Sequence, residues 1–498
     1  MNSFWIESIK KIQDSGTLEK DANADVCIIG AGICGITTAY YLIKRGYKVI
    51  VIDKDEIANK VTGHTTAKIT SQHGLIYHYL EKEYGVKFAK KYFEANEDAI
   101  KNIRNIIQEN SIDCDFQEVD SYIYTCDEKE VEKINQEADS LKSININSTK
   151  TNESDLPFNI LEAVKFKNQA QFNPLKYIKG LVNYILKNGG KIYTKTLCTD
   201  VKRKNDEYTT YANGHKIHSK YVVLASQYPF LKVPGLYFTK MYQSLSYVIA
   251  LETNSKLPNG MYLNVESPTY SFRTANNNGK EILLLGGADH KTGDKVDYEK
   301  TYGILEKKAK EIYPDCKILY KWSTRDAITL DKIPYIGEYS NLLPNMYIGT
   351  GFNKWGMTSS NVAANIIADK IEGKFNAYEE VFKSTRLKPI TNKGEMKNMI
   401  VDSTKSLIIN KLKEDSLQIK DITNNSGGIV EFDGEKVGIY KNEEGKIYCV
   451  KPICTHLGCL LEWNDADKTW DCPCHGSRFN RYGKNIYGPA IKDLDILV

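Results

Sequence analysis

The sequence contains no long apolar run. No stretch of about 18 uncharged apolar residues occurs in its 498 residues, so no transmembrane segment is predicted. Residues 1–24 alternate charged and polar side chains and lack the apolar core of a signal peptide. We therefore expect a cytoplasmic protein, and peripheral attachment to a membrane stays open as an alternative.

An excess of positive charge is also missing. The 67 basic and 63 acidic residues are interleaved and leave a formal net charge of +4, with no basic tail. The chain therefore lacks the electrostatic footprint of a nucleic-acid-binding protein, and we expect no nucleic-acid partner. Its length exceeds what one hydrophobic core supports, so two or more domains are expected.

Cysteines are too unevenly placed to form a disulfide framework. The chain has eleven, an odd number, and no secretion signal. Five of them fall between Cys449 and Cys474. This local density indicates a site.

Two short motifs in this region each combine cysteine with histidine. The first is Cys454-Thr-His456-Leu-Gly-Cys, and the second is Cys472-Pro-Cys-His475-Gly-Ser. Two thiolates can hold one iron while two neutral imidazoles hold the other, which predicts a Rieske-type [2Fe–2S] cluster. Zinc is the alternative, because Cys₂His₂ is also a zinc ligand set. Zinc fingers place their histidines on a helix, however, and these motifs lie in turns of a predicted β domain.

About the last 80 residues resemble the Rieske family, in particular the subtype of respiratory and photosynthetic cytochrome complexes. The resemblance implies a disulfide between Cys459 and Cys474 that braces the two ligand loops, and a hydrogen bond from Ser477 to a cluster sulfide. Where that subtype has a tyrosine bonded to a ligand sulfur, this chain has Phe479. A missing donor leaves the sulfur more electron-rich, so we expect a lower reduction potential than in that subtype.

A glycine-rich turn follows the first apolar run of the chain. Gly30, Gly32 and Gly35 have the spacing G-x-G-x-x-G between a predicted strand and a predicted helix, and Asp53 ends the next strand. Such a turn lets backbone N–H groups approach a pyrophosphate, and the acid accepts hydrogen bonds from ribose hydroxyls. FAD and NAD both fit this fingerprint, and a glycine-rich turn without a ligand is the plain alternative.

Residues 24–375 resemble the D-amino-acid-oxidase and glycine-oxidase-like family of FAD-dependent oxidoreductases. The likeness rests on segments that occur in the family's order, namely Thr62-Gly-His-Thr-Thr-Ala67, Phe172-Asn-Pro-Leu175, Val222-Val-Leu-Ala225, Ile333-Pro-Tyr-Ile-Gly337 and Gly349-Thr-Gly-Phe-Asn-Lys-Trp-Gly-Met-Thr358. The resemblance implies FAD as the cofactor, with the last glycine-rich loop beside the flavin ring. The expected cofactor-binding residues are Gly30, Gly32, Gly35, Asp53, His64, Thr65, Thr66, Gly351, Trp355, Gly356, Met357 and Thr358. The sequence has no second nucleotide fingerprint for NADH.

Three residues are candidates for the substrate site. In glycine-oxidase-like relatives an arginine shortly before the P-x-I-G motif binds the substrate carboxylate, and the resemblance places Asp326 there, with Arg325 one residue earlier. The exchange favours a cationic amine opposite Asp326, although an Asp326 paired with Arg325 or Lys332 is an equal alternative. Arg273 is another candidate carboxylate clamp, or else a solvated strand arginine.

Three histidines lie near these segments. His64 lies where some relatives attach flavin covalently, and covalent attachment is kept as an alternative. His73 and His78 have the H-x4-H spacing of the mononuclear iron motif of Rieske oxygenases, but Thr70 replaces the aspartate that this motif needs. We therefore interpret them as ordinary polar or core histidines.

The predicted fold class is α/β plus all-β. Residues 1–393 are expected to form a Rossmann-type FAD-dependent oxidoreductase with an interleaved β-rich substrate domain, followed by a helical connector at 394–416 and a small antiparallel-β Rieske domain at 417–498. The FAD-binding parts are expected at about 24–75, 155–235 and 320–375, and the substrate parts at about 76–154 and 236–319.

Two functions fit this organisation. The first is a dehydrogenase in which a small amine or amino-acid-like substrate gives hydride to the flavin. The cluster then passes single electrons to an external acceptor, which could be a quinone, a cytochrome or a soluble carrier. The second is an electron-transfer or redox-sensing module without turnover of its own.

Overall fold

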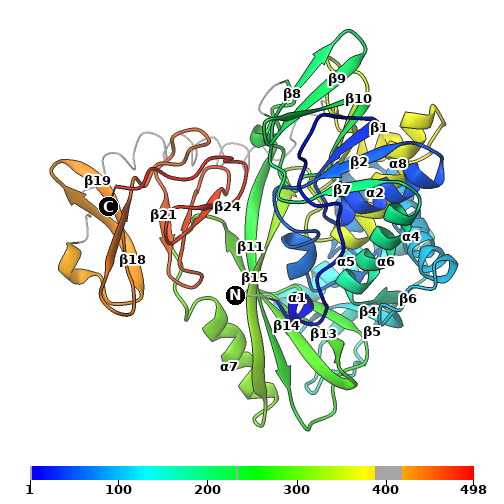
Figure 1. Ribbon diagram of the computed structural model, residues 1–498. Coiled ribbons are helices and arrows are strands. Elements are labelled where there is room, and N and C mark those ends of the chain that lie inside the picture. Colours follow the sequence, from blue (N-terminus) through cyan, green and yellow to red (C-terminus); the bar gives the residue numbers. More distant parts are fainter. Residues whose placement is uncertain (1–2, 232–233, 387–417, 498) are drawn as a thin grey trace.

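The computed structural model describes residues 3–231, 234–386 and 418–497 and contains a large N-terminal part and a small C-terminal β domain (Figure 1). The large part is built on two sheets with helices packed around them. The connector predicted at residues 394–416 lies outside the described residues.

The first sheet carries the predicted strand-helix-strand unit. Its strand order is β16-β17-β10-β1-β2-β7, and β16 alone on this path runs antiparallel to its neighbour. All of β2 and the second half of β1 are buried, as expected for parallel strands covered on both faces. Its strands, including the β8–β9 hairpin beside β10, are β1 (Ala22–Ile29), β2 (Val49–Ile52), β7 (Lys191–Tyr193), β8 (Cys198–Lys204), β9 (Glu207–Ala212), β10 (His215–Leu224), β16 (Tyr335–Glu338) and β17 (Met346–Thr350).

Three helices pack together beside this sheet. Helix α2 (Ile33–Lys44) connects β1 to β2 and packs against α6 (Pro174–Lys187) and α8 (Gly356–Glu372). The Asn-Pro pair of the sequence marks the start of α6, because the Asn173 side chain caps the helix and Pro174 occupies its first turn. The remaining helices and 3₁₀ turns of the large part are α1 (Phe4–Glu7), η1 (Val61–His64), α3 (Ile76–Tyr84), α4 (Val86–Glu109), η2 (Glu128–Glu130), α5 (Val131–Ser143), η3 (Tyr237–Thr239), α7 (Tyr302–Ile312) and α9 (Glu379–Phe382).

The second sheet has nine strands in the order β15-β11-β14-β13-β12-β4-β6-β3, with β5 beside β6. Its strands are β3 (Lys68–Ile69), β4 (Gln117–Thr125), β5 (Ser148–Thr151), β6 (Glu162–Gln171), β11 (Met241–Glu252), β12 (Met261–Asn264), β13 (Tyr270–Asn277), β14 (Lys280–Lys291) and β15 (Lys317–Thr329). Strand β6 and most of β15 fall within the ranges predicted as FAD-binding, and they are part of this sheet because β6 pairs with β4 and β15 pairs with β11.

The C-terminal domain consists of two small antiparallel sheets, as predicted. Trp470 and Phe479 are fully buried in its core beside the two predicted cysteine ligands. After the turn η4 (Ile419–Asp421), its strands are β18 (Ser426–Phe432), β19 (Glu435–Lys441), β20 (Ile447–Val450), β21 (Glu462–Asn464), β22 (Thr469–Asp471), β23 (Arg478–Asn480) and β24 (Asn485–Tyr487).

The second of these small sheets lies next to the long strands β11 and β15 of the large part (Figure 1). The first, with β18 and β19, lies farther out. Within the three described ranges, no helix is both long enough and apolar enough to cross a membrane.

Candidate functional site

The glycine-rich turn between β1 and α2 lies against the acid that ends β2. The N–H of Ala31 donates to Asp53 Oδ2 at 2.7 Å, and the N–H of Asp55 donates to Asp53 Oδ1 at 2.9 Å. A Cβ atom on Gly35 would lie 1.8 Å from the carbonyl oxygen of Gly30, so helix and turn can approach only with glycine there. Burial raises the pKa of Asp53 to about 6, although the two N–H donors oppose this.

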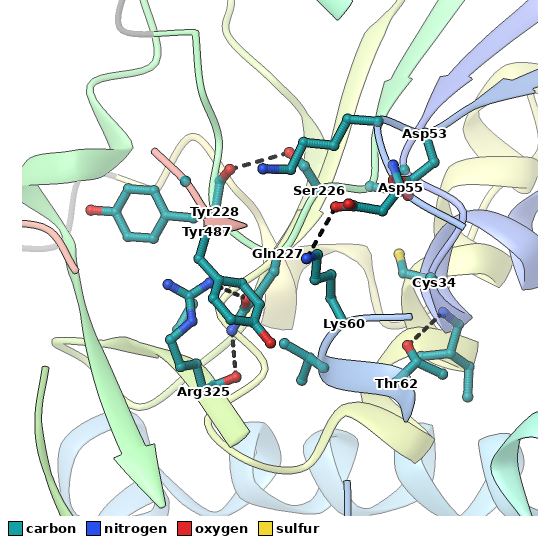
Figure 2. A pocket seen from close by; sticks show the side chains of 18 of the residues that line it. Cys34, Asp53, Asp55, Lys60, Thr62, Ser226, Gln227, Tyr228, Arg325 and Tyr487 are labelled. Atoms are coloured by element: carbon teal, nitrogen blue, oxygen red, sulfur yellow. Dashed lines mark hydrogen bonds and ion pairs between the residues drawn. The ribbon is translucent and has the colours of Figure 1, made fainter. Parts of the chain in front are cut away.

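A cavity extends from this turn to the start of α8, and we call it the dinucleotide cavity (Figure 2). It contains both the glycine-rich turn and Asp53, the groups that the dinucleotide fingerprint assigns to the pyrophosphate and a ribose. The predicted cofactor-binding residues that line it are Gly30, Gly32, Asp53, Thr65, Gly351, Gly356 and Met357. Gly35 instead packs α2 onto the turn.

A second cavity, which we call the side cavity, adjoins the first. Thr65, Asp326, Lys354 and Met357 line both cavities, so the side cavity meets the end of the dinucleotide cavity that lies at α8. The predicted residues Thr66 and Trp355 line the side cavity alone. The side cavity therefore adjoins the glycine-rich loop that is expected to lie beside the flavin ring.

The side cavity contains charged groups of both signs. Lys354 forms an ion pair with Asp289, with an N–O distance of 2.9 Å. In the described part of the chain Asp326 and Lys68 form no ion pair, and the Lys68 ammonium donates to the carbonyl of Tyr262 at 2.7 Å. Among the described residues, neither Arg325 nor Lys332 therefore forms an ion pair with Asp326, although Arg325 is near enough to act on its pKa.

Both unpaired groups have shifted pKa values because they are removed from water. Burial raises the pKa of Asp326 to about 6, while the nearby cations Lys354 and Arg325 act in the opposite direction. Burial, together with the nearby Arg273 cation, lowers the pKa of Lys68 to about 7. The side cavity therefore offers one carboxylate and one ammonium group to a ligand.

The two candidate arginines are engaged elsewhere. The Arg325 guanidinium donates to the carbonyl of Gly476 in the C-terminal domain at 2.8 Å. Arg273 is 2% exposed, and it donates to the carbonyls of Thr66 and Ala67, each at 2.9 Å. The prediction of a substrate clamp at Arg273 thus finds no support, and its alternative as a solvated arginine is wrong because backbone carbonyls far away in sequence enclose it.

The histidines and the remaining predicted residue have structural partners. His64 Nδ1 lies 2.7 Å from the carbonyl oxygen of Lys60, and His64 lines neither cavity. His73 is buried, with Nδ1 2.7 Å from the Tyr92 hydroxyl, and burial lowers its pKa to about 3. Thr358 binds His73 Nε2 at 3.1 Å. The interpretation of His73 as a core histidine agrees with these contacts.

The predicted cluster ligands lie on two loops of the same shape. In the first loop the N–H of Cys454 donates to the carbonyl of Cys459 at 2.8 Å, and in the second the N–H of Cys472 donates to the carbonyl of Ser477 at 2.8 Å. Cys454 and Cys472 are buried side by side in one core. The two loops thus hold their cysteines in equivalent positions.

The two ligand histidines lie together at one end of this pair of loops. The ring centroids of His456 and His475 are 5.1 Å apart, with the rings nearly perpendicular. Both rings lie edge-on to Phe238 of the large part, at centroid distances of 6.2 and 5.6 Å. The imidazole end of the site therefore faces the large part of the chain.

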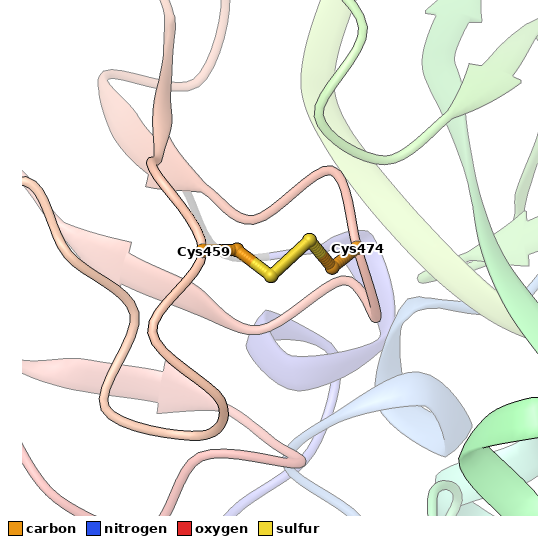
Figure 3. Close-up of a disulfide and its surroundings, with 2 residues drawn as sticks. All are labelled: Cys459 and Cys474. Atoms are coloured by element: carbon orange, nitrogen blue, oxygen red, sulfur yellow. A yellow bond between two sulfur atoms is a disulfide. The ribbon is translucent and has the colours of Figure 1, made fainter. Parts of the chain in front are cut away.

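The predicted disulfide between Cys459 and Cys474 is confirmed, and it joins the two loops (Figure 3). The sulfur atoms of Cys459, Cys472 and Cys474 lie within 4.8 Å of one another. Because two of them are bonded to each other, they cannot act as thiolate ligands. This leaves one cysteine and one histidine on each loop for a metal site, which fits the two-plus-two ligand set of a Rieske cluster.

Comparison with known families agrees with both sites. Residues 25–370 match the FAD dependent oxidoreductase family, and residues 415–497 match the Rieske [2Fe-2S] domain. The chain belongs to the FAD-dependent oxidoreductase family. The family implies FAD as the cofactor in place of NAD, and the Rieske domain implies a [2Fe–2S] cluster in place of zinc.

Individual relatives agree with this family assignment. The Rieske 2Fe-2S iron-sulfur protein YhfW of Bacillus subtilis is 40% identical over 477 residues, which are 96% of this chain and 94% of that protein. Gamma-glutamylputrescine oxidoreductase of Escherichia coli is 23% identical, over 76% of this chain and 91% of that enzyme. The crystal structure of glycine oxidase from Geobacillus kaustophilus superposes with a TM-score of 0.62 at 17% identity, over 73% of this chain and 99% of that chain, which confirms the predicted fold.

Sequence reasoning missed three residues that line the cavities, Lys354, Lys68 and Asp289, and one residue beside the cluster histidines, Phe238. Lys354 lies inside the glycine-rich segment that ends at Thr358, and Lys68 follows the Thr-Thr-Ala segment directly, so both could have been found there. Asp289 and Phe238 carry no local signal, because their roles depend on contacts across the fold.

Proposed function

We propose that this FAD-dependent oxidoreductase is a dehydrogenase for a small amino-acid-like amine and passes the electrons through its Rieske cluster to an external acceptor. The single observation that carries the proposal is the side cavity beside the dinucleotide cavity, in which Asp326 and Lys68 have no ionic partner among the residues that the structure describes. An amine that also carries an acidic group would satisfy both. The acceptor would be a quinone, a cytochrome or a soluble carrier.

The residues of the side cavity would bind and orient the substrate. The substrate ammonium would donate to Asp326, and a carboxylate would accept from Lys68. The Asp289–Lys354 ion pair holds a further cation at the boundary of the two cavities. FAD, when bound, would supply a hydride acceptor, and the cluster would supply a one-electron acceptor.

The reaction balances as an amine oxidation. The substrate loses a hydride from carbon and a proton from nitrogen and becomes an imine, which water hydrolyses. The name of gamma-glutamylputrescine oxidoreductase, a relative that matches 76% of this chain, also points to an amine with a distant acidic group.

Anaerobic mixing of the loaded protein with matched compounds tests the proposal. Each set contains an amine with a carboxylate, the same amine without it, and the acid without the amine. We expect flavin bleaching, followed by the EPR signal of the reduced cluster, with the first compound and much weaker bleaching with the others. Inertness to all amines and amino acids would overturn the proposal and favour a redox module without turnover.

Asp326→Asn and the pH dependence of binding test the role of Asp326. Asp326, with a pKa of about 6, is charged above that pH and neutral below it. The apparent affinity for a cationic amine should therefore fall as the pH drops below about 6 in the wild type. Asp326→Asn should bind the amine weakly at every pH. Its KM should be about tenfold to a hundredfold higher than that of the wild type, because one charge-assisted hydrogen bond is lost. An unchanged KM in this variant would contradict the role.

A further inference from the structure

The C-terminal domain forms part of the wall of the dinucleotide cavity. Residues 486–491, which include the end of β24, line this cavity together with residues of the large part. Lys54, which follows Asp53, donates from its ammonium to Asn485 Oδ1 at 2.9 Å. The domain with the predicted cluster ligands thus forms part of the wall of the expected FAD site.

Arg325 connects this wall with a ligand loop. Its guanidinium donates to the carbonyl of Gly476, the residue after the ligand His475, at 2.8 Å. The same guanidinium lies over the ring of Tyr487, at 3.6 Å from the centroid, as Figure 2 shows. Arg325 Nη2 also donates to Gln227 Oε1 at 3.3 Å, and Gln227 lines the dinucleotide cavity.

Arg325 is a buried cation without a close ionic partner among the described residues, which is unusual for a residue with a purely structural role. Arg325 is 3% exposed, it forms no ion pair within the described ranges, and its Nε has no hydrogen-bond partner there. Burying a cation without a carboxylate is costly, so an apolar residue of similar size would serve stability alone at least as well. The position of Arg325 therefore indicates a role in joining the two cofactor sites.

Gln243 on β11 provides a second connection to the same loop. Its side-chain amide donates to the carbonyl of His475 at 2.7 Å and to the carbonyl of Gly488 at 3.1 Å. A Cβ atom at Gly476 would lie 2.6 Å from the Cβ of Gln243, so glycine allows the loop to rest directly on β11. Two adjacent carbonyls of the cluster loop, those of His475 and Gly476, consequently accept hydrogen bonds from the large part of the chain.

We propose that Arg325 and Gln243 are positioning residues that fix the cluster loop and the wall at Tyr487 in one electron-transfer geometry with FAD. This inference rests on the proposed electron path between the two cofactors. Each electron that moves along it oxidises the reduced flavin by one electron and reduces one ferric iron of the cluster to ferrous iron. Two such transfers, with the external acceptor emptying the cluster in between, reoxidise a flavin that holds two electrons.

Light-driven reduction of the full-length protein tests the inference without a substrate. A flash with deazaflavin and EDTA supplies electrons to FAD under anaerobic conditions, and cluster reduction is followed by visible circular dichroism and by EPR. In the wild type we expect a transfer rate that does not depend on protein concentration. A rate proportional to protein concentration would mean transfer between molecules and would overturn the proposal.

Arg325→Ala is the decisive variant. We expect it to slow electron transfer from FAD to the cluster by at least about tenfold, because a small displacement of the cluster loop relative to FAD lowers the transfer rate. The midpoint potentials and the content of both cofactors should stay at wild-type values, which separates positioning from damage to either site. Arg481→Ala is the matched control, since Arg481 also packs over tyrosine rings, those of Tyr440 and Tyr482 within the C-terminal domain.

Two milder variants keep the inference testable if Arg325→Ala loses a cofactor. Arg325→Lys retains the positive charge but loses the planar contact with Tyr487, and Gln243→Ala removes the second connection. Both should slow the transfer while retaining FAD and cluster. Wild-type rates in these fully loaded variants would overturn the proposal. A slowed transfer in a protein that no amine reduces would refute the proposed substrate class and leave the positioning role intact.

Discussion

Arg325 and Asp326 are neighbours on β15, but they serve opposite sides of the strand. Successive side chains of a strand point to opposite faces, so Arg325 reaches the cluster loop while Asp326 reaches the side cavity. Their electrostatic effects are linked, because the Arg325 cation opposes the burial that raises the pKa of Asp326. One dipeptide thus contacts the proposed substrate site and the cluster domain.

Phe479 provides a test of cluster tuning by a single hydroxyl group. It is fully buried in the core that contains Cys454 and Cys472. Phe479→Tyr should add a donor to a ligand sulfur and stabilise the reduced cluster. We expect the midpoint potential to rise by about 60 mV, the one-electron equivalent of about 1.4 kcal/mol, which is the scale of one hydrogen bond to a charged group.

Redox titration followed by the EPR signal of the cluster measures this change. Phe479→Leu is the control for altered packing without a hydroxyl, and its potential should stay near that of the wild type. A midpoint potential of Phe479→Tyr that is unchanged or lower would refute the hydrogen-bond argument.

At the scale of elements, the two ligand loops depend on the disulfide that joins them. The bond between Cys459 and Cys474 closes a segment with a sequence separation of 15. Removing it with Cys459→Ser and Cys474→Ser should lower the stability of the C-terminal domain by about 3 kcal/mol, because the unfolded chain regains the entropy of that loop. Urea unfolding monitored by the visible circular dichroism of the cluster measures the loss.

Cys449→Ser is the matched control for the disulfide, because Cys449 is a free cysteine of the same domain. Its unfolding midpoint should equal that of the wild type. The double serine variant should also become insensitive to a reductant that destabilises the wild type. Equal midpoints for the double variant and the wild type would mean that the loops hold their shape without the bond.

Elements whose contacts are local were predictable from the sequence. The unit β1–α2–β2 and the two ligand loops each lie within a short stretch, and their glycine, cysteine and histidine spacings specify them. The pairing of β6 with β4 and of β15 with β11 could not be predicted from the sequence, because strand pairing is a property of the whole fold. Arg273 was misjudged for the same reason, since its carbonyl partner at Ala67 lies far away in the sequence.

At the scale of the whole molecule, one carboxylate joins the two domains outside the cavity wall. Asp467 of the C-terminal domain accepts hydrogen bonds from Ser323 at 2.5 Å and from the Tyr302 hydroxyl at 3.3 Å, both in the large part. It also forms an ion pair with the buried Arg478 at 2.8 Å. Docking of the domains and the charge balance of Arg478 therefore depend on the same side chain.

Asp467→Asn should uncouple the unfolding of the two domains. The wild type should lose flavin fluorescence quenching and cluster circular dichroism at one urea concentration, because the docked domains unfold cooperatively. In the variant the cluster signal should change first. The free energy of unfolding of the C-terminal domain should fall by about 3 kcal/mol, because the buried Arg478 loses one of its two carboxylate partners and keeps only Asp471. Asp465→Asn is the control, because Asp465 bonds to Ser426 and Trp463 within its own domain. Coincident transitions at wild-type midpoints in Asp467→Asn would mean that the docked state does not depend on this carboxylate.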